Sequence, residues 1–268
     1  MTTLLSTAVQ IVETADLDAK VTLAKDTAKA WHHRRLSRGA SRGIKLPETP
    51  GRPSCPKLLP AREMPRRTTA GLKGRIALLH SLAHIELSAI DMTWDLIARS
   101  GDAPVPRSYF DDWVRVGVEE AKHFELLCRR LESLGSHYGA LPAHDGLWQT
   151  SHATGDDLIA RLAIVPLVLE ARGLDVGPAM IEKMTGHGDA DSARVLEIIY
   201  RDEKRHVAFG VKWFSYLCAR KKVDPMAMFH DLVRRHFRGP LKPPFNDKAR
   251  SEAGLTPGFY KPLASFAG

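Results

Sequence analysis

Apolar residues recur at spacings of three and four along four long stretches of the chain, a period typical of amphipathic helices that bury one face. Short segments rich in glycine or proline, 101–106 and 186–190, follow the first and the third stretch and predict turns. The pattern therefore predicts an all-α fold with two antiparallel helical hairpins. The four helices are expected at residues 71–100, 108–134, 156–185 and 191–219.

The N-terminal part of the chain predicts shorter elements. Residues 1–32 fit one or two short amphipathic helices that dock on the hairpins. Residues 33–70, which we call the strap, contain prolines at a density that excludes a long helix and favours an extended path along the surface. We expect residues 1–70 to pack on the helical core of a single domain.

Other segments complete this expected architecture. Residues 135–156 form the long crossover between the two hairpins, and residues 225–238 fit a fifth helix. The last segment, 239–268, has five prolines and is expected to wrap around the core as a tail. The helical core itself is expected at residues 71–238.

Two of the long helices carry the sequence Glu-x-x-His, Glu120 with His123 and Glu203 with His206. Residues three apart on a helix lie about 60° apart around the axis and about 4.5 Å apart along it, so both side chains can reach one metal ion. Each motif is preceded by a glutamate on another predicted helix, Glu86 or Glu170. The distances along the chain are similar, 120 − 86 = 34 residues and 203 − 170 = 33 residues. The nearly equal spacing is expected to bring the ligands of each hairpin to the same height.

This order of ligands is that of di-iron and di-manganese carboxylate bundles, in which two helices give one Glu each and two give Glu-x-x-His. Four buried carboxylates repel one another and are costly to desolvate, whereas two divalent cations balance their charge. Carboxylate and imidazole ligands suit iron or manganese better than a closed zinc site. In the alternative interpretation, two of the four glutamates pair with Arg or Lys on solvated faces.

Four residues near the ligands are candidates for a supporting role. Glu119 and Asp202 each precede a ligand glutamate and either accept the ring N–H of a ligand histidine or remain surface acids. Tyr200 either donates a hydrogen bond to a metal-bound group, or holds a radical, or packs with its hydroxyl satisfied. Arg172 pairs with Asp175, with Asp202 or with a substrate anion.

Three further positions carry specific expectations. Pro166 lies one turn before Glu170 and removes a backbone hydrogen bond, so a kink or a π-type irregularity is expected there. His80 and His84 lie on the far side of their helix from Glu86, and we expect structural polar contacts for both. Asp91 also lies off the ligand stripe, and we expect an arginine partner for it.

Composition bounds the class of protein. The chain has 268 residues and 44% hydrophobic content, which is enough for one substantial core. Its three cysteines, Cys55, Cys128 and Cys218, form no Cys-x-x-Cys, and the odd number argues against a disulfide framework, so we expect a reducing, cytoplasmic location. No apolar run approaches the length of a membrane span, and the first residues do not resemble a signal peptide.

The net charge of +8 is concentrated in one segment. Residues 31–75 hold 12 Lys or Arg against Glu48 and Glu63, a local balance of +10, so the rest of the chain sums to 8 − 10 = −2. Such a segment either meets phosphate or an acidic partner, or lies as a solvated arm on an acidic core.

Five strings carry a resemblance to a known family. Over residues 46–250 the chain resembles a bacterial family of uncharacterised ferritin-like proteins, and the strings are HIEL at 84–87, EEAKHF at 119–124, LPAHDGLW at 141–148, LEARGLD at 169–175 and DEKRHVA at 202–208. The resemblance implies a ferritin-like four-helix bundle but no substrate. It also implies the metal ligands Glu86, Glu120, His123, Glu170, Glu203 and His206.

The expected function is an oxidoreductase that holds two iron ions, or an iron and a manganese ion, and activates dioxygen or peroxide. Its substrate is an unknown small molecule or an RNA, and its electrons come from an external donor because no flavin or ferredoxin motif is present. We expect a monomer or small homo-oligomer with no membrane partner. The alternatives are metal handling or storage without catalysis, and a binding module whose basic segment engages nucleic acid or an acidic partner.

Overall fold

Helices form every regular element in the described part of the chain, which comprises residues 2–65 and 71–264 of a computed structural model. The prediction of an all-α fold is therefore confirmed. The chain divides into two compact units, Met1–Gln149 and Thr150–Gly268, so each unit contains one of the two hairpins. No helix within the described ranges is long and apolar enough to cross a membrane.

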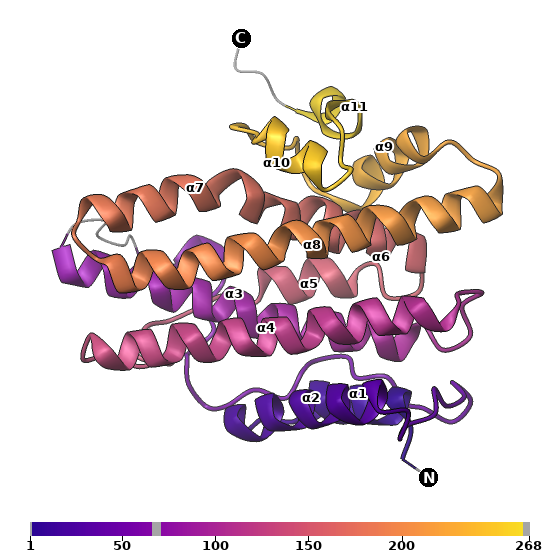
Figure 1. Ribbon diagram of the computed structural model, residues 1–268, viewed down its shortest axis with the longest axis horizontal. Helices are drawn as coiled ribbons and strands as arrows, with labels where there is room; N and C mark the ends of the chain where they lie inside the picture. Colours follow the sequence, from indigo (N-terminus) through magenta and orange to yellow (C-terminus); the bar gives the residue numbers. More distant parts are fainter. Residues whose placement is uncertain (1, 66–70, 265–268) are drawn as a thin grey trace. The chain divides into compact units, whose positions relative to one another are not determined.

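The first unit is built on a hairpin of two long helices, α3 (Gly71–Arg99) and α4 (Arg107–Ser133). Both begin and end within one residue of their predicted limits. The helices α1 (Leu4–Glu13) and α2 (Leu17–His32) cover this hairpin, α1 mainly on α3 and α2 mainly on α4 (Figure 1). Their apolar faces, not their propensity alone, hold such short helices in place. Two N-terminal helices were among the predicted possibilities, and both are present.

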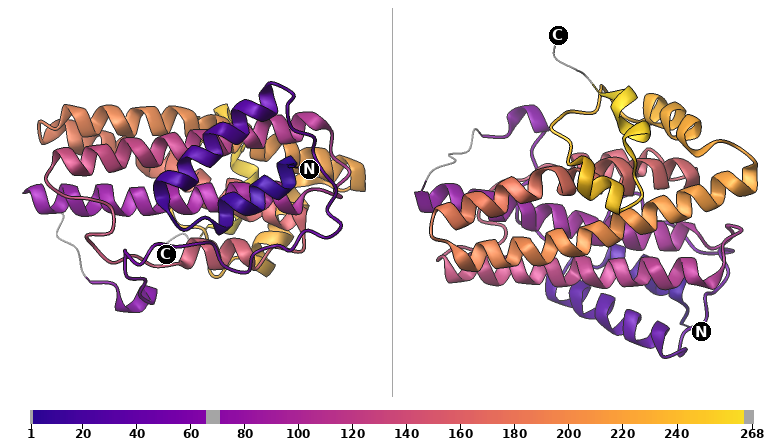
Figure 2. Two further views of the ribbon diagram at one scale, coloured as in Figure 1. Left: turned by 90° about the horizontal axis from the view of Figure 1, so that it is seen from below. Right: turned by 45° about the horizontal axis from the view of Figure 1, so that its top comes forward.

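The strap follows an extended path in its described part, with only the short 3₁₀ turn Ala61–Glu63 as regular structure (Figure 2). Residues 66–70 lie outside the described residues. Backbone hydrogen bonds fasten the strap to α1: the N–H of Leu4 donates to the Ser37 carbonyl at 2.9 Å, and the N–H of Gly51 donates to the Val12 carbonyl at 2.8 Å. The strap is therefore part of the packed unit.

The crossover contains a short helix that was not expected from the sequence, α5 (Gly146–His152), which spans the limit between the two units. Trp148 is buried, and its indole N–H donates to the Glu48 carbonyl of the strap at 3.0 Å. The crossover also pairs with the strap where the N–H of Leu59 donates to the Ala143 carbonyl at 2.8 Å. These contacts order a segment that lacks a helical period of its own.

The second unit contains the helix expected at residues 156–185 as three consecutive segments. The α6 helix (Leu158–Ile164) continues as a π-helical segment, η2 (Val165–Glu170), and then as α7 (Ala171–Gly186). Pro166 lies inside the π segment, which confirms the expected irregularity. Its ring removes a backbone donor and crowds the preceding turn, so the helix widens at this point.

The partner of this helix is α8 (Ala190–Lys221), which lies beside α7 (Figure 1). Two glycines of the hairpin mark close approaches. A Cβ atom at Gly177 would lie 2.8 Å from the Tyr200 ring, and one at Gly210 would lie 2.5 Å from Pro166 Cβ. These contacts fix the antiparallel register of the second hairpin.

The C-terminal part of the second unit has more regular structure than the expected tail. The predicted fifth helix is present as α9 (Pro225–His236). It is followed by α10 (Asp247–Glu252), by α11 (Pro257–Tyr260) and by a 3₁₀ turn at Lys261–Leu263. A buried bidentate ion pair between Arg250 and Asp175, 2.7 Å on each arm, ties α10 to α7.

The three cysteines are free thiols with different surroundings, since Cys55 is exposed, Cys128 half-buried and Cys218 buried. Burial raises the pKa of Cys128 to about 12 and that of Cys218 to about 11. Because the thiolate is the nucleophile, we expect brief alkylation at neutral pH to modify Cys55 alone. Mass spectrometry of tryptic peptides checks this, with the unfolded protein as control, and rapid modification of Cys128 would contradict the structure.

Candidate metal centre

The first hairpin gathers three predicted ligands in its buried interior. Glu86 comes from α3, and Glu120 and His123 come from α4, with relative exposures of 4%, 0% and 0%. Nδ1 of His123 lies 3.3 Å from Oε2 of Glu86 and 3.3 Å from Oε2 of Glu120. Each residue offers one donor atom, and these atoms lie within 4.8 Å of one another. One metal ion between them fits this donor set.

Helix geometry explains the arrangement in this hairpin. Glu120 and His123 are three residues apart and therefore share one face of α4. Side chains one turn further along the same faces, Ile90, Phe124 and Leu127, are buried and apolar. The hairpin thus places two carboxylates and an imidazole where few water molecules can solvate them. Burying these charged groups costs free energy unless a positive charge compensates them.

The second hairpin brings two of its three predicted ligands together. Glu203 and His206 are buried on one face of α8, and Nδ1 of His206 lies 3.5 Å from Oε1 of Glu203. Glu170 is the last residue of the π segment. A Cβ atom at Gly173 would lie 3.8 Å from Cγ of Glu203, so Glu203 lies against the helix one turn after Glu170. With the close approach of Pro166 and Gly210, this register places Glu170 level with His206.

The candidates beside the ligands have protein partners. Arg115 donates to Glu119 at 3.2 Å, and Arg201 and Arg205 lie 3.4 and 3.2 Å from a carboxylate oxygen of Asp202. Asp202 is buried, so it is not the solvated surface acid of the alternative interpretation. That either acid orients a ligand histidine stays a prediction.

Tyr200 and Arg172 make contacts with other protein groups, which were among the alternatives that the sequence left open. The Tyr200 ring packs against Gly177, and its hydroxyl accepts a hydrogen bond from the Asn246 side chain at 3.1 Å. Arg172 lies 3.3 Å from Asp175 and donates to the carbonyls of Lys242 and Pro244 at 2.8 and 3.0 Å. Arg172 therefore holds the C-terminal segment on α7.

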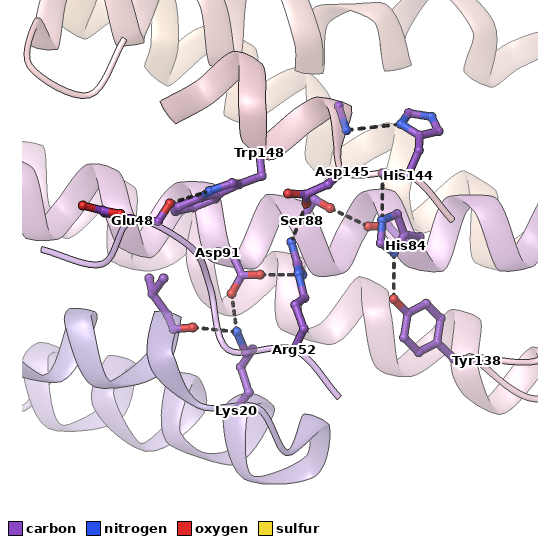
Figure 3. Close-up of polar contacts among 12 residues, drawn as sticks. Lys20, Glu48, Arg52, His84, Ser88, Asp91, Tyr138, His144, Asp145 and Trp148 are labelled. Carbon is purple, nitrogen blue, oxygen red and sulfur yellow. Dashed lines mark hydrogen bonds and ion pairs between the residues drawn. The ribbon is translucent and has the colours of Figure 1, made fainter. Parts of the chain in front are cut away.

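The two histidines of α3 make structural contacts, as predicted. Nε2 of His80 accepts the backbone N–H of Gly139 at 2.9 Å. The His84 ring lies 2.7 Å from the Tyr138 hydroxyl through Nδ1 and 3.1 Å from the His144 carbonyl through Nε2 (Figure 3). Burial, reinforced by the charge of Arg52, lowers the pKa of His84 to about 4. His84 is therefore neutral at physiological pH and pins the crossover to α3.

A buried ion-pair network beside this contact was only partly predicted. Asp91 receives its expected arginine, because Arg52 of the strap donates to it at 2.7 Å and also lies 3.4 Å from Asp145 (Figure 3). Its second partner, Lys20 of α2, is fully buried and also donates to the Val12 carbonyl at 3.1 Å. The burial of Lys20 could have been expected from the sequence, because Lys20 lies on the apolar face of residues 17–32, four positions before Ala24.

Comparison with known proteins gives a family without an assigned activity. Residues 13–261 match the family described as "Protein of unknown function (DUF455)", a span that includes both hairpins and all six predicted ligands. A Haemophilus influenzae protein named "Uncharacterized protein" is 38% identical over 209 residues, which cover 76% of this chain and 73% of the relative. No solved structure gives a significant match. The extent of the family match shows that the chain belongs to the DUF455 family.

Proposed function

We propose that the two hairpins form a ferritin-like four-helix bundle whose ligand sets together hold two metal ions, either two iron ions or one iron and one manganese. We further propose that the protein is an oxidoreductase that uses dioxygen or peroxide. The ligands are Glu86, Glu120 and His123 from the first hairpin and Glu170, Glu203 and His206 from the second.

The contact of His123 with both Glu86 and Glu120, 3.3 Å each, is the observation that carries the proposal. This contact joins α3 and α4 through carboxylate and imidazole atoms, which iron and manganese accept as ligands. All three side chains are almost completely buried. The second hairpin supports it independently with the buried pair of Glu203 and His206. Two ligand sets of the same composition favour two ions over one.

Charge favours the same conclusion. The proposed ligand set contains four carboxylates and two imidazoles, and two divalent cations balance the four negative charges. Buried carboxylates without such balance cost several kcal/mol each. A fold that retains them on both hairpins therefore favours a bound pair of cations over empty acidic cavities.

The π segment before Glu170 supports a functional rather than a purely structural site. Single π turns inside α-helices occur frequently at functional sites, because they re-aim side chains at some cost in backbone regularity. Here the irregular turn ends on a proposed ligand. Iron or manganese held by these residues would supply redox chemistry toward dioxygen or peroxide. The chain itself contributes the proposed ligands and the buried apolar side chains around them.

The proposal is tested by anaerobic titration of the purified protein with Fe(II), followed by exposure to air. We expect uptake of about two iron ions per chain and an absorption change that appears only when oxygen is admitted. Protein that takes up no iron would overturn the metal centre. Protein that takes up iron without any response to oxygen or peroxide would overturn the oxidoreductase and leave metal handling as the function.

A further inference from the structure

A short basic loop in the strap, residues 34–45, presents positive charge that the metal proposal does not use. All five of its cations are solvent-exposed, and no Asp or Glu occurs from residue 32 to residue 47. Four of the five are arginines. The five cations are Arg34, Arg35, Arg38, Arg42 and Lys45.

The charged groups of this loop are not used for internal ion pairs. Within the described ranges, the side chains of Arg34, Arg35, Arg42 and Lys45 have no hydrogen bond or ion pair, and Arg38 lies 5.9 Å from the Phe110 ring as a cation–π contact. Other cations of the same unit are paired instead, such as Arg99 with Asp95 at 2.8 Å. The loop therefore carries an uncompensated charge, which attracts anionic partners.

The backbone of the loop is fixed even though its cations extend into solvent. The N–H groups of Leu4 and Leu5 donate to the carbonyls of Ser37 and Arg38 at 2.9 and 3.1 Å. Gly39 has φ +89°, and a Cβ atom there would lie 2.5 Å from the Thr3 hydroxyl oxygen, so the close approach requires glycine. A fixed backbone lowers the entropy cost of binding.

The neighbouring residues indicate which anion the loop fits. Stable protein interfaces centre on apolar and aromatic anchors, and peripheral membrane binding adds apolar side chains that enter the lipid. The large hydrophobic residues with clear exposure in the described chain are Leu58, Leu72, Ile85 and Met226, none of them in the loop. A row of arginines without an apolar anchor instead suits a ligand with a repeated negative charge. Guanidinium groups also bind phosphate oxygens in a bidentate manner.

We propose that the basic loop binds the phosphate backbone of a nucleic acid. The loop contains no Phe, Tyr or Trp, and Trp31 at the end of α2 is buried, so stacking of bases on such rings does not contribute to the contact. RNA and DNA offer the same phosphate chemistry, and the experiment separates them. The inference does not depend on the metal centre.

The test is fluorescence anisotropy with two labelled probes of mixed sequence and about 20 nucleotides per strand, a single-stranded RNA and a duplex DNA, each titrated from about 50 to 200 mM salt. The loop variant combines Arg34→Gln, Arg35→Gln, Arg42→Gln and Lys45→Gln. The control variant removes the same charge from exposed cations of the second unit. It combines Lys183→Gln, Arg220→Gln, Lys221→Gln and Lys222→Gln.

We expect the affinity of the unaltered protein to fall about 100-fold over this salt range, as four phosphate contacts predict. The loop variant should bind at least about tenfold more weakly at low salt, and its slope of log affinity against log salt concentration should be smaller by about 3 to 4. The control variant should keep most of the affinity and most of the slope. Tighter binding of RNA than of DNA at the same loop would identify the partner as RNA.

Three results would overturn the proposal: no binding to either probe at low salt, equal losses in the loop and control variants, or displacement of the probe by polyglutamate at equal charge concentration. The last result would favour an acidic protein partner. Circular dichroism of each variant establishes that it has kept its fold, and a normal metal content in the loop variant separates this test from that of the metal centre.

Discussion

Replacing Glu120 with Gln is expected to lower the metal affinity of the protein by about 100-fold or more. The substitution keeps the shape of the side chain but removes the charge of a fully buried carboxylate that we propose as a ligand, 3.3 Å from Nδ1 of His123. Loss of a partner outside the coordination sphere typically costs about 10- to 100-fold in affinity, and loss of a ligand costs at least that. Elemental analysis and Fe(II) titration of the purified variant measure the effect.

The matched control for this experiment is Glu125→Gln on the same helix. Glu125 pairs with Lys25 at 2.5 Å, and both side chains are partly exposed. Its replacement removes the same charge from α4 without touching the ligand face, so metal content and affinity should stay as in the unaltered protein. Equal metal content in the Glu120 and Glu125 variants would show that Glu120 is not a ligand.

Replacing Asp91 with Ala is expected to lower the free energy of unfolding by about 3–5 kcal/mol, because it leaves the ammonium group of Lys20 without its buried carboxylate. Both side chains of this ion pair have 0% exposure. Arg52 loses the same partner but keeps Asp145 and partial access to solvent. Urea-induced unfolding followed by circular dichroism measures the loss.

Two further variants show whether the uncompensated charge is the cause. The double variant Lys20→Met, Asp91→Leu removes both charges of the pair and should regain most of the lost stability, since apolar pairs often replace buried ion pairs without loss. Glu125→Ala breaks the partly exposed pair with Lys25 and should cost less than about 1 kcal/mol. A cost for Asp91→Ala no larger than that of Glu125→Ala would contradict the buried network.

The long helices were predictable because their apolar faces repeat over many turns. A period of 3.6 residues sustained from Gly71 to Arg99 or from Ala190 to Lys221 leaves little choice of structure, and the predicted limits lie within two residues of these ends. The π segment at Val165–Glu170 was predictable for a local reason, the proline inside it.

The shortest C-terminal helices, α10 and α11, were not predictable, because tertiary contacts stabilise them more than their own sequences do. Four residues at Pro257–Tyr260 or six at Asp247–Glu252 are too few for a readable period. They depend on contacts such as the Arg250 pair with Asp175, which are distant in sequence. The same holds for Lys20, whose partner Asp91 is 71 residues away.

The grouping of Glu120 with His123 and of Glu203 with His206 was predictable from spacing, and that these residues bind metal stays a prediction. Glu120 and His123 had to share a face of one helix, and the turn length placed Glu86 opposite them. The roles of the neighbouring residues were not fixed by spacing, because Tyr200 and Arg172 each had several partners within reach. Asn246 and the carbonyls of Lys242 and Pro244, which the structure places against them, come from the C-terminal segment.

The most direct test of the central claim, a two-metal centre built from both hairpins, is the iron and manganese content per chain of the protein purified without added metal, measured beside Glu120→Gln and Glu203→Gln. We predict about two ions per chain in the unaltered protein and a marked loss in both variants, because each substitution removes a proposed ligand of the two-metal centre. Metal-free protein that takes up no iron, or a metal content that neither substitution changes, would contradict the account.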